Sequence, residues 1–209
     1  MNPTILGDEA AVQHLLSILR DCETTSAEFR ERTDSLAALV IAAALRDAPF
    51  SNISIETPLE RVDVRRIDEA RVIGVPILRA GLGMERAFSR LLPAAPIYHI
   101  GLKRDEGTFI PNYYYDSFPG NLTGKTAFLL DPMLATGGSA IAAAKRISAL
   151  NPEKIVYCGI IGAPEGVGAL SAAFPTMDIF LSTLDDHLDE TAYIRPGLGD
   201  AGDRYYGTL

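Results

Sequence analysis

The sequence predicts an α/β protein with a mostly parallel sheet that is covered by helices. Several short runs are rich in β-branched residues and almost continuously apolar, and they alternate with segments that have helical spacing. Strands that are apolar throughout are buried on both faces, which is typical of parallel strands joined by helical crossovers. The runs predicted as strands are 71–78, 96–103, 126–131, 154–161 and 177–184.

Local signals mark the helices and one further strand. A capping-box pattern, Thr25-Ser26-Ala27-Glu28, opens one helix, Pro93 stops another, and Pro164 suits a first helical turn. Residues 52–59 alternate like a strand. The predicted helices are 9–21, 26–47, 81–92, 138–150 and 164–173.

Length and composition favour a single domain over residues 1–209. The chain is 47% apolar and 22% charged, which suits a packed core, and it shows no repeat or linker. Three segments depart from the regular alternation: an N-terminal helical and strand segment (1–60), a hairpin at about 103–125 that is expected to reach away from the sheet, and an irregular tail (185–209). A long irregular tail with aromatic residues indicates function.

Charge and cysteine content narrow the class of protein. The net charge of −8 argues against a nucleic-acid partner, and no apolar run is long enough to cross a bilayer. The N-terminus lacks a signal-peptide pattern, and two cysteines cannot form a disulfide framework. Cys158 is expected to be a buried apolar residue. We therefore expect a cytoplasmic protein.

Three apparent motifs lack the sequence context that their function requires. Residues 120–126 resemble a P-loop, but three residues separate the glycines where four are required, and a strand follows where a helix is required. Residues 197–202 match GxGxxG, but they have no preceding strand and almost no chain after them. The three histidines have no cysteine or carboxylate at zinc-ligand spacing.

The run FLLDPMLATGGSAIAAAKRI (128–147) has the layout of a phosphate site. Its strand delivers Asp131 to the carboxyl edge of the sheet, where ligands bind in open α/β folds. The helix that follows begins near Gly138, and its free amides and positive dipole end attract an anion. The loop contains no lysine, so it suits a single monophosphate, with Asp131 facing sugar hydroxyls. A plain strand-to-helix connection capped by Asp131 is the alternative.

Three motifs resemble those of the uracil phosphoribosyltransferases. DPMLATGGS (131–139) resembles the loop for phosphoribosyl pyrophosphate (PRPP), VPILRAGLGM (75–84) the pyrophosphate loop, and YIRPGLGDAGDRYYGT (193–208) the uracil-binding tail. The resemblance covers about residue 70 to the end. It implies a type I phosphoribosyltransferase fold, with a protruding β-hairpin and a C-terminal hood over the base.

The resemblance also assigns site residues. Arg79, Arg104 and Asp200 would be catalytic, and uracil would bind backbone groups at Ile194, Gly199, Asp200 and Ala201. It allows for a cis peptide at Arg79–Ala80. Arg195 departs from the family pattern, which commonly has an apolar residue there. The residues that would bind PRPP are Arg79, Arg104, Asp131, Pro132, Met133, Leu134, Ala135, Thr136, Gly137, Gly138, Ser139 and Asp200.

The implied reaction transfers phosphoribose from PRPP to N1 of uracil and yields UMP and diphosphate, a step of pyrimidine salvage. Mg²⁺ would be carried by PRPP with no protein-held cluster. A homodimer or higher homo-oligomer, activation by GTP and inhibition by CTP are further implications. Two alternatives remain open: a uracil- or nucleotide-sensing RNA-binding regulator on the same fold, and the same chemistry on another base.

Overall fold

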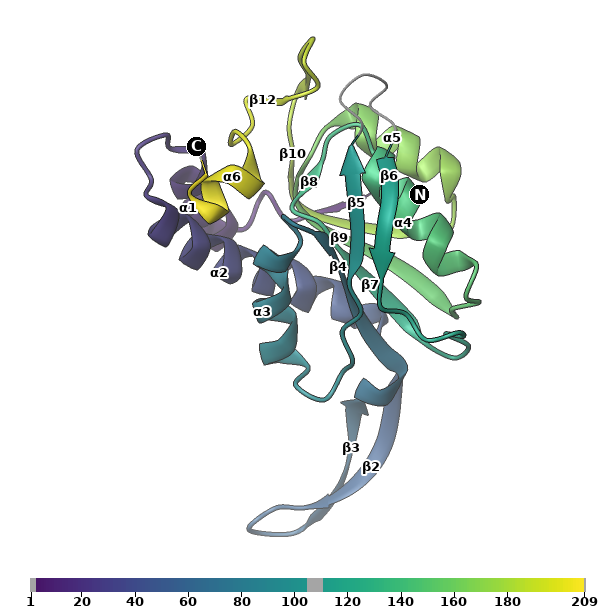
Figure 1. Ribbon diagram of the computed structural model, residues 1–209. Helices are drawn as coiled ribbons and strands as arrows, with labels where there is room; N and C mark the ends of the chain where they lie inside the picture. The colour runs from purple at the N-terminus through teal and green to yellow at the C-terminus, as the bar shows by residue number, and fades with distance from the viewer. Residues whose placement is uncertain (1–2, 105–110, 209) are drawn as a thin grey trace.

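The structure is a computed structural model that describes residues 3–104 and 111–208. At positions 103, 104, 111 and 112 it describes the backbone but not the side chain. Its centre is a twisted sheet in the order β1-β10-β9-β7-β4-β5-β6, with β8 paired to β9 (Figure 1). All pairings in this sheet are parallel except that of β5 with β6, so the predicted fold class is confirmed. The strands are β1 (Thr4–Ile5), β4 (Val72–Leu78), β5 (Ile100–Arg104), β6 (Pro111–Asp116), β7 (Thr126–Leu130), β8 (Met133–Leu134), β9 (Lys154–Gly162) and β10 (Asp178–Leu184).

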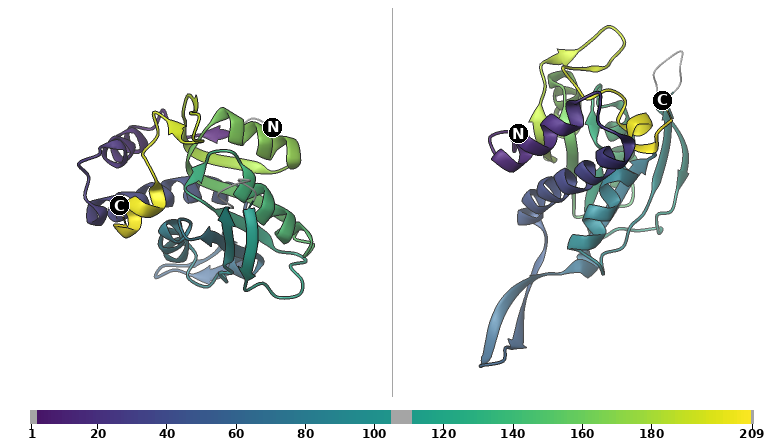
Figure 2. Two further views of the ribbon diagram at one scale, coloured as in Figure 1. Left: turned by 45° about the horizontal axis from the view of Figure 1, so that its top comes forward. Right: turned by 90° about the vertical axis from the view of Figure 1, so that its left-hand side faces the viewer.

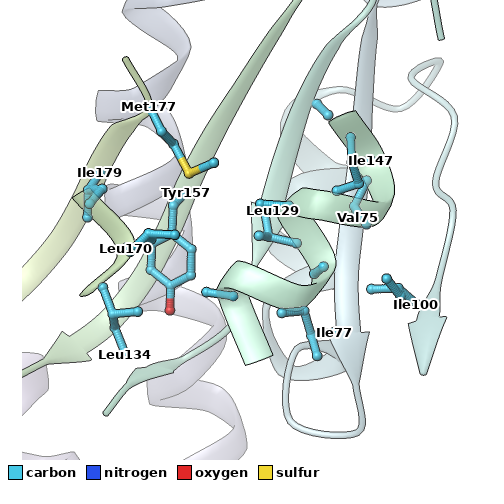
Figure 3. Close-up of a cluster of buried hydrophobic side chains, with 14 of the residues drawn as sticks. Val75, Ile77, Ile100, Leu129, Leu134, Ile147, Tyr157, Leu170, Met177 and Ile179 are labelled. Carbon is cyan, nitrogen blue, oxygen red and sulfur yellow. The ribbon is translucent and has the colours of Figure 1, made fainter. Parts of the chain in front are cut away.

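Helices cover both faces of the sheet. Along β7, Ala127 and Leu129 face the cluster formed with α4 and α5, whereas Phe128 and Leu130 face the cluster formed with α2 and α3. Figure 3 shows the first cluster, in which strand side chains meet those of the two helices. This alternation explains why the strands read as continuous apolar runs. The helices are α1 (Ala10–Arg20), α2 (Ser26–Ala44), α3 (Leu82–Leu91), α4 (Gly138–Ser148) and α5 (Pro164–Ala173).

Several local predictions are confirmed. The Thr25 hydroxyl accepts a hydrogen bond from the Glu28 amide at 3.3 Å and caps α2, and Pro164 is the first residue of α5. Cys158 is fully buried. The helix predicted to reach residue 47 ends at Ala44 and continues as the 3₁₀ turn η1 (Leu45–Asp47). A second 3₁₀ turn, η2 (Glu69–Arg71), precedes β4.

Two hairpins differ from the prediction. Strand β5 begins at Ile100, later than predicted. The β5–β6 hairpin was expected to reach away from the sheet, but its two strands instead form the edge of the main sheet. A separate hairpin, β2 (Phe50–Glu56) with β3 (Arg61–Ile67), projects far from the body (Figure 2). The sequence predicted only the first of its two strands, because β3 carries charges on most of its positions.

The tail lies against the N-terminal helices. It forms a two-stranded ribbon, β11 (His187–Leu188) with β12 (Ile194–Arg195), and then the short helix α6 (Ala201–Tyr206). Figure 1 shows α6, in yellow, beside α1 and α2. Across the described ranges, no helix combines the length and apolar character needed to cross a membrane.

Candidate active site

A cleft of about 360 Å³ opens at the carboxyl edge of the sheet. Three chain segments form its walls: the turn 77–80 after β4, the ribbon 191–194, and the tail 199–202. Asp131, Met133, Ala135 and Ser139 line it from the β7–α4 loop. The structure therefore brings together the three motifs that the sequence singled out, although they are spread over more than half of the chain.

The β7–α4 loop is fixed to strand β9 through its main chain. The Asp131 amide donates to the Cys158 carbonyl at 3.1 Å, and the amides of Ile160 and Ile161 both donate to the Pro132 carbonyl at 3.0 Å. The short strand β8 then pairs in parallel with the end of β9. A loop held at successive residues has little freedom, so its amides keep a fixed direction.

Helix α4 begins at the point that anion binding requires. Gly137 caps it in the left-handed region, with φ of +80°, which favours glycine. The first amides of a helix have no intrahelical partner and lie at the positive end of its dipole. The Ser139 side chain stands in this first turn and lines the cleft. This arrangement suits a phosphate group.

The predicted PRPP residues do not all face the main cleft. Leu134, Thr136, Gly137 and Gly138 line a small adjoining hollow of about 20 Å³ around the start of α4, which shares Asp131 and Ser139 with the cleft. Pro132 lines neither cavity; it is buried, and its carbonyl holds the loop to β9.

Arg79 projects from the turn after β4, with 65% of its side chain exposed. Its guanidinium lies 3.7 Å from the Asp203 carboxylate and 5.7 Å from the centre of the Tyr206 ring. The Tyr206 hydroxyl donates to the Arg79 carbonyl at 3.0 Å. Helix α6 therefore contacts both the backbone and the side chain of Arg79.

The cis peptide that the resemblance allowed for at Arg79–Ala80 lies one residue earlier, at Leu78–Arg79. The bond lies inside a tight turn that the Gly81 amide closes by donating to the Ile77 carbonyl at 2.8 Å.

Two of the tail residues that line the cleft, Gly199 and Gly202, have no side chain, so only their main chain can face it. Ile194 is buried, and Asp200 caps α6 by accepting a hydrogen bond from the Asp203 amide at 2.9 Å. Arg195, the departure from the family pattern, is exposed and forms an ion pair with Asp189 at 2.5 Å, so it does not line the cleft. Hydrogen bonds from Thr191 and from the Tyr193 amide hold the pKa of Asp189 well below its usual range.

Arg104 is only partly within the described structure. Its backbone ends β5 and pairs with Pro111, while its side chain lies outside the described part of the chain. The tip of the β5–β6 hairpin, residues 105–110, also lies outside it.

Sequence reasoning missed one residue that supports the site. Tyr157 on β9 is fully buried, and its hydroxyl donates to the Asp131 carbonyl at 2.9 Å. Burial, followed by the nearby charge of Asp131, raises the pKa of this phenol well above its usual value, so it remains a hydrogen-bond donor. In the sequence Tyr157 reads as one more apolar strand residue, and no local signal separates it from its neighbours.

The fold is one that phosphoribosyltransferases have. The adenine phosphoribosyl transferase from Trypanosoma brucei has the same fold, with a TM-score of 0.54 and 11% identity, over 90% of this chain and 86% of that one. The AQ2163 protein from Aquifex aeolicus is much more similar, with a TM-score of 0.90 and 33% identity over 95% of both chains.

The particular family follows from the sequence comparisons. The family model for uracil phosphoribosyltransferase matches residues 5–208. The uracil phosphoribosyltransferase of Pediococcus pentosaceus is 44% identical over 201 residues, or 96% of each chain, and that of Symbiobacterium thermophilum is 44% identical over 208 residues and the full length of both. The chain belongs to the uracil phosphoribosyltransferase family and is therefore a glycosyltransferase.

The Tyr157 hydrogen bond yields a test of the loop's anchoring. Tyr157→Phe leaves the buried Asp131 carbonyl without this donor, which costs about 1–3 kcal/mol of stability. Because Asp131 begins the loop that the sequence predicts to bind PRPP, we expect the KM for PRPP to rise severalfold as well, measured by steady-state kinetics beside chemical denaturation.

Thr24→Val is the control for this variant. Its half-buried hydroxyl donates to the Ile18 carbonyl near the end of α1 at 2.6 Å, away from the loop. The control should lose stability and keep its KM for PRPP. Equal KM values for PRPP in Tyr157→Phe and the wild type would contradict the anchoring role.

Proposed function

We propose that this chain transfers the phosphoribosyl group of PRPP to N1 of uracil in the cleft at the carboxyl edge of the sheet, and releases UMP and diphosphate. The observation that carries the proposal is that two segments line the same cleft: the loop at the start of α4, which suits a phosphate, and the glycine-rich segment 199–202. Membership of the family supports the same reaction. The product makes this a step of pyrimidine salvage.

The loop 131–139 suits the ribose 5-phosphate. Amides and hydroxyls at the start of α4 each contribute about 1.5–3 kcal/mol when they bind a charged oxygen, more than the helix dipole alone. Asp131 lies at the base of the loop and lines the cleft, where its carboxylate accepts hydrogen bonds from ribose hydroxyls.

The tail suits a base that is recognised by backbone groups. Uracil presents a fixed pattern of donors and acceptors, and a rigid main chain at Ile194 and Gly199–Ala201 matches such a pattern without side-chain adjustment. Cytosine reverses groups on the same edge and would leave buried polar groups unpaired, which gives strong discrimination.

In the reaction, N1 of uracil bonds to the anomeric carbon as the bond to diphosphate breaks. The sugar passes through an oxocarbenium-like state, and the departing diphosphate takes the negative charge. Arg79 stands at the cleft to stabilise that charge, and we assign the same role to Arg104 at the end of β5. Closure of the β5–β6 hairpin would exclude water from the reacting sugar.

Mg²⁺ fits this cleft as a cation that PRPP carries. Mg²⁺ is ordinarily bound through one or two carboxylates together with substrate phosphates. Asp131 and Asp200 both line the cleft, and they are the carboxylates that would complete its coordination. When bound, Mg²⁺ would neutralise charge on the diphosphate.

A panel of bases tests the function. With PRPP and Mg²⁺, we expect diphosphate release with uracil and little with cytosine, hypoxanthine or adenine, because only uracil matches the backbone pattern. Release that is independent of the base, or a preference for a purine, would refute the assignment. Adding GTP or CTP to the same assay tests the regulation that family resemblance implies.

The two arginines are tested by removal. Arg79→Ala and Arg104→Ala should each lower kcat by roughly 10²–10³-fold, because each withdraws positive charge from the leaving group. Arg79→Ala should keep the wild-type circular dichroism spectrum, since Arg79 is largely exposed; the same spectrum serves as the folding control for Arg104→Ala. Near-normal kcat in either variant would remove that residue from the mechanism.

We propose that the protein is located in the cytoplasm, where its two free cysteines would stay reduced. We also propose that it is a homo-oligomer that assembles through the β2–β3 arm. Ile53 pairs with Val64 and Ile55 with Val62, so four apolar side chains share one face of a two-stranded ribbon. Figure 2 shows the arm extending away from the body, and an isolated hairpin is only marginally stable in water. A second copy of the chain would cover this face and stabilise the arm.

Substitutions on the two faces of the arm separate assembly from folding. Ile53→Asp places a charge on the apolar face and should lower the oligomer mass in sedimentation at micromolar concentration, because the charge would be buried against the partner. Asn52→Asp, on the opposite face of the same strand and paired with Arg65, should leave the mass unchanged. An unchanged mass for Ile53→Asp would exclude the arm as the contact.

A further inference from the structure

One turn of the tail supports the cleft without lining it. Gly197 and Leu198 are buried between the two backbone segments assigned to the base, Ile194 on one side and Gly199–Ala201 on the other. The Arg195–Pro196 peptide is cis, and Gly197 has φ of +68°. A Cβ on Gly197 would lie 2.1 Å from the Ile194 carbonyl oxygen, so the turn is folded tightly against Ile194.

A partly buried ion pair, with 26% of the Arg20 side chain exposed, holds both polar backbone groups of Gly197. Asp185, which directly follows β10, accepts from the Gly197 amide at 2.9 Å, and Arg20, the last residue of α1, donates to the Gly197 carbonyl at 2.7 Å. The two side chains also bind each other through two hydrogen bonds, at 2.8 and 2.5 Å. Only 2% of the Asp185 side chain is exposed. We call Arg20 and Asp185 the Gly197 clamp.

The clamp is itself fixed to the body of the protein. The Asp185 amide donates to the Gly162 carbonyl at the end of β9, at 2.8 Å. A bidentate arginine–carboxylate pair has a defined plane and direction. The position of the Gly197 peptide is therefore set by the end of the central sheet and the end of α1 together.

Stability alone does not explain the clamp. Replacing a buried ion pair by apolar residues of similar volume is often neutral or stabilising. Such a pair therefore orients the groups that it binds more than it stabilises the fold. The tail has a separate anchor in Arg204, whose guanidinium donates to the Leu198 carbonyl at 2.8 Å and to carbonyls at the end of α1, and lies over the Phe29 ring. Arg204 would keep the tail docked if the clamp were lost.

We propose that Arg20 and Asp185 are positioning residues for the nucleobase, which fix the Gly197 peptide and so set the alignment of the base-reading backbone at Ile194 and Gly199–Ala201. This inference rests on the base site proposed above. Neither side chain lines the cleft, so their effect is indirect. Recognition by main chain needs groups held within about 0.5 Å of the productive geometry, and a clamp on both polar groups of the intervening peptide provides this.

The test compares the KM values of the two substrates. Asp185→Asn keeps the side-chain shape but removes the charge and turns an amide N–H towards Arg20 or Gly197. We expect KM for uracil to rise about tenfold or more while KM for PRPP stays within about twofold, because misplacement by an ångström can cost about 100-fold in the affected step. Arg20→Lys, which cannot form the planar fork, should give a smaller shift in the same direction.

Hydrogen exchange gives a direct readout of the turn. The amide of Gly197 should exchange faster in Asp185→Asn, while the amides of the β7–α4 loop should not change. Glu153→Gln is the matched control: it breaks another arginine–carboxylate contact, Arg71–Glu153 at 2.7 Å, far from the tail, and should leave both KM values and the tail exchange unchanged.

Two outcomes overturn the clamp proposal. The first is an unchanged KM for uracil in both Asp185→Asn and Arg20→Lys. The second is a parallel rise of KM for uracil and for PRPP with a lowered Tm, which would show that the pair only stabilises the fold.

Gly199→Ala distinguishes failure of the clamp proposal from failure of the proposed base site, because Gly199 lines the cleft with φ of +79°. If Gly199→Ala leaves KM for uracil unchanged, the base site itself is wrong; if it raises KM and the clamp variants do not, only the clamp fails.

Discussion

The main-chain hydrogen bonds between strand β9 and the loop 131–139 are the constraint on which the cleft depends. They join the Asp131 amide and the Pro132 carbonyl to the centre of a strand that is buried on both faces. The loop consequently inherits the rigidity of the sheet, and α4 starts in a fixed direction. A phosphate bound there meets amides that need no rearrangement, which is how a chain of net charge −8 can hold an anion without a lysine in the loop.

The two ends of the chain complete the other wall. The tail would be a free segment if it met only the sheet edge, because its strands are two residues long and its helix has six. Arginines on both sides of the contact, Arg20 from α1 and Arg204 from α6, donate to main-chain carbonyls across it. The N-terminal helices thus hold the tail in place although none of their residues lines the cleft.

Helix α6 connects the proposed base segment to the proposed diphosphate residue. Its first turn is capped by Asp200, which lines the cleft, and its later residues contact Arg79 through Asp203 and Tyr206. One short helix therefore contacts both the proposed base segment and the turn after β4.

The sequence by itself determined the parallel sheet, most helix ends and the strand–loop–helix layout around residues 131–139, because these depend on local patterns: apolar runs, a Thr25 cap, and a strand that enters a glycine-rich turn. It also indicated that three motifs share one site. Tertiary structure alone decided which peptide is cis, that β2 and β3 form a projecting arm, that Tyr157 supports Asp131, and that Arg20 meets Asp185. The reason is distance along the chain: Arg20 and Asp185 are 165 residues apart, and only the folded sheet and helix α1 bring their side chains together.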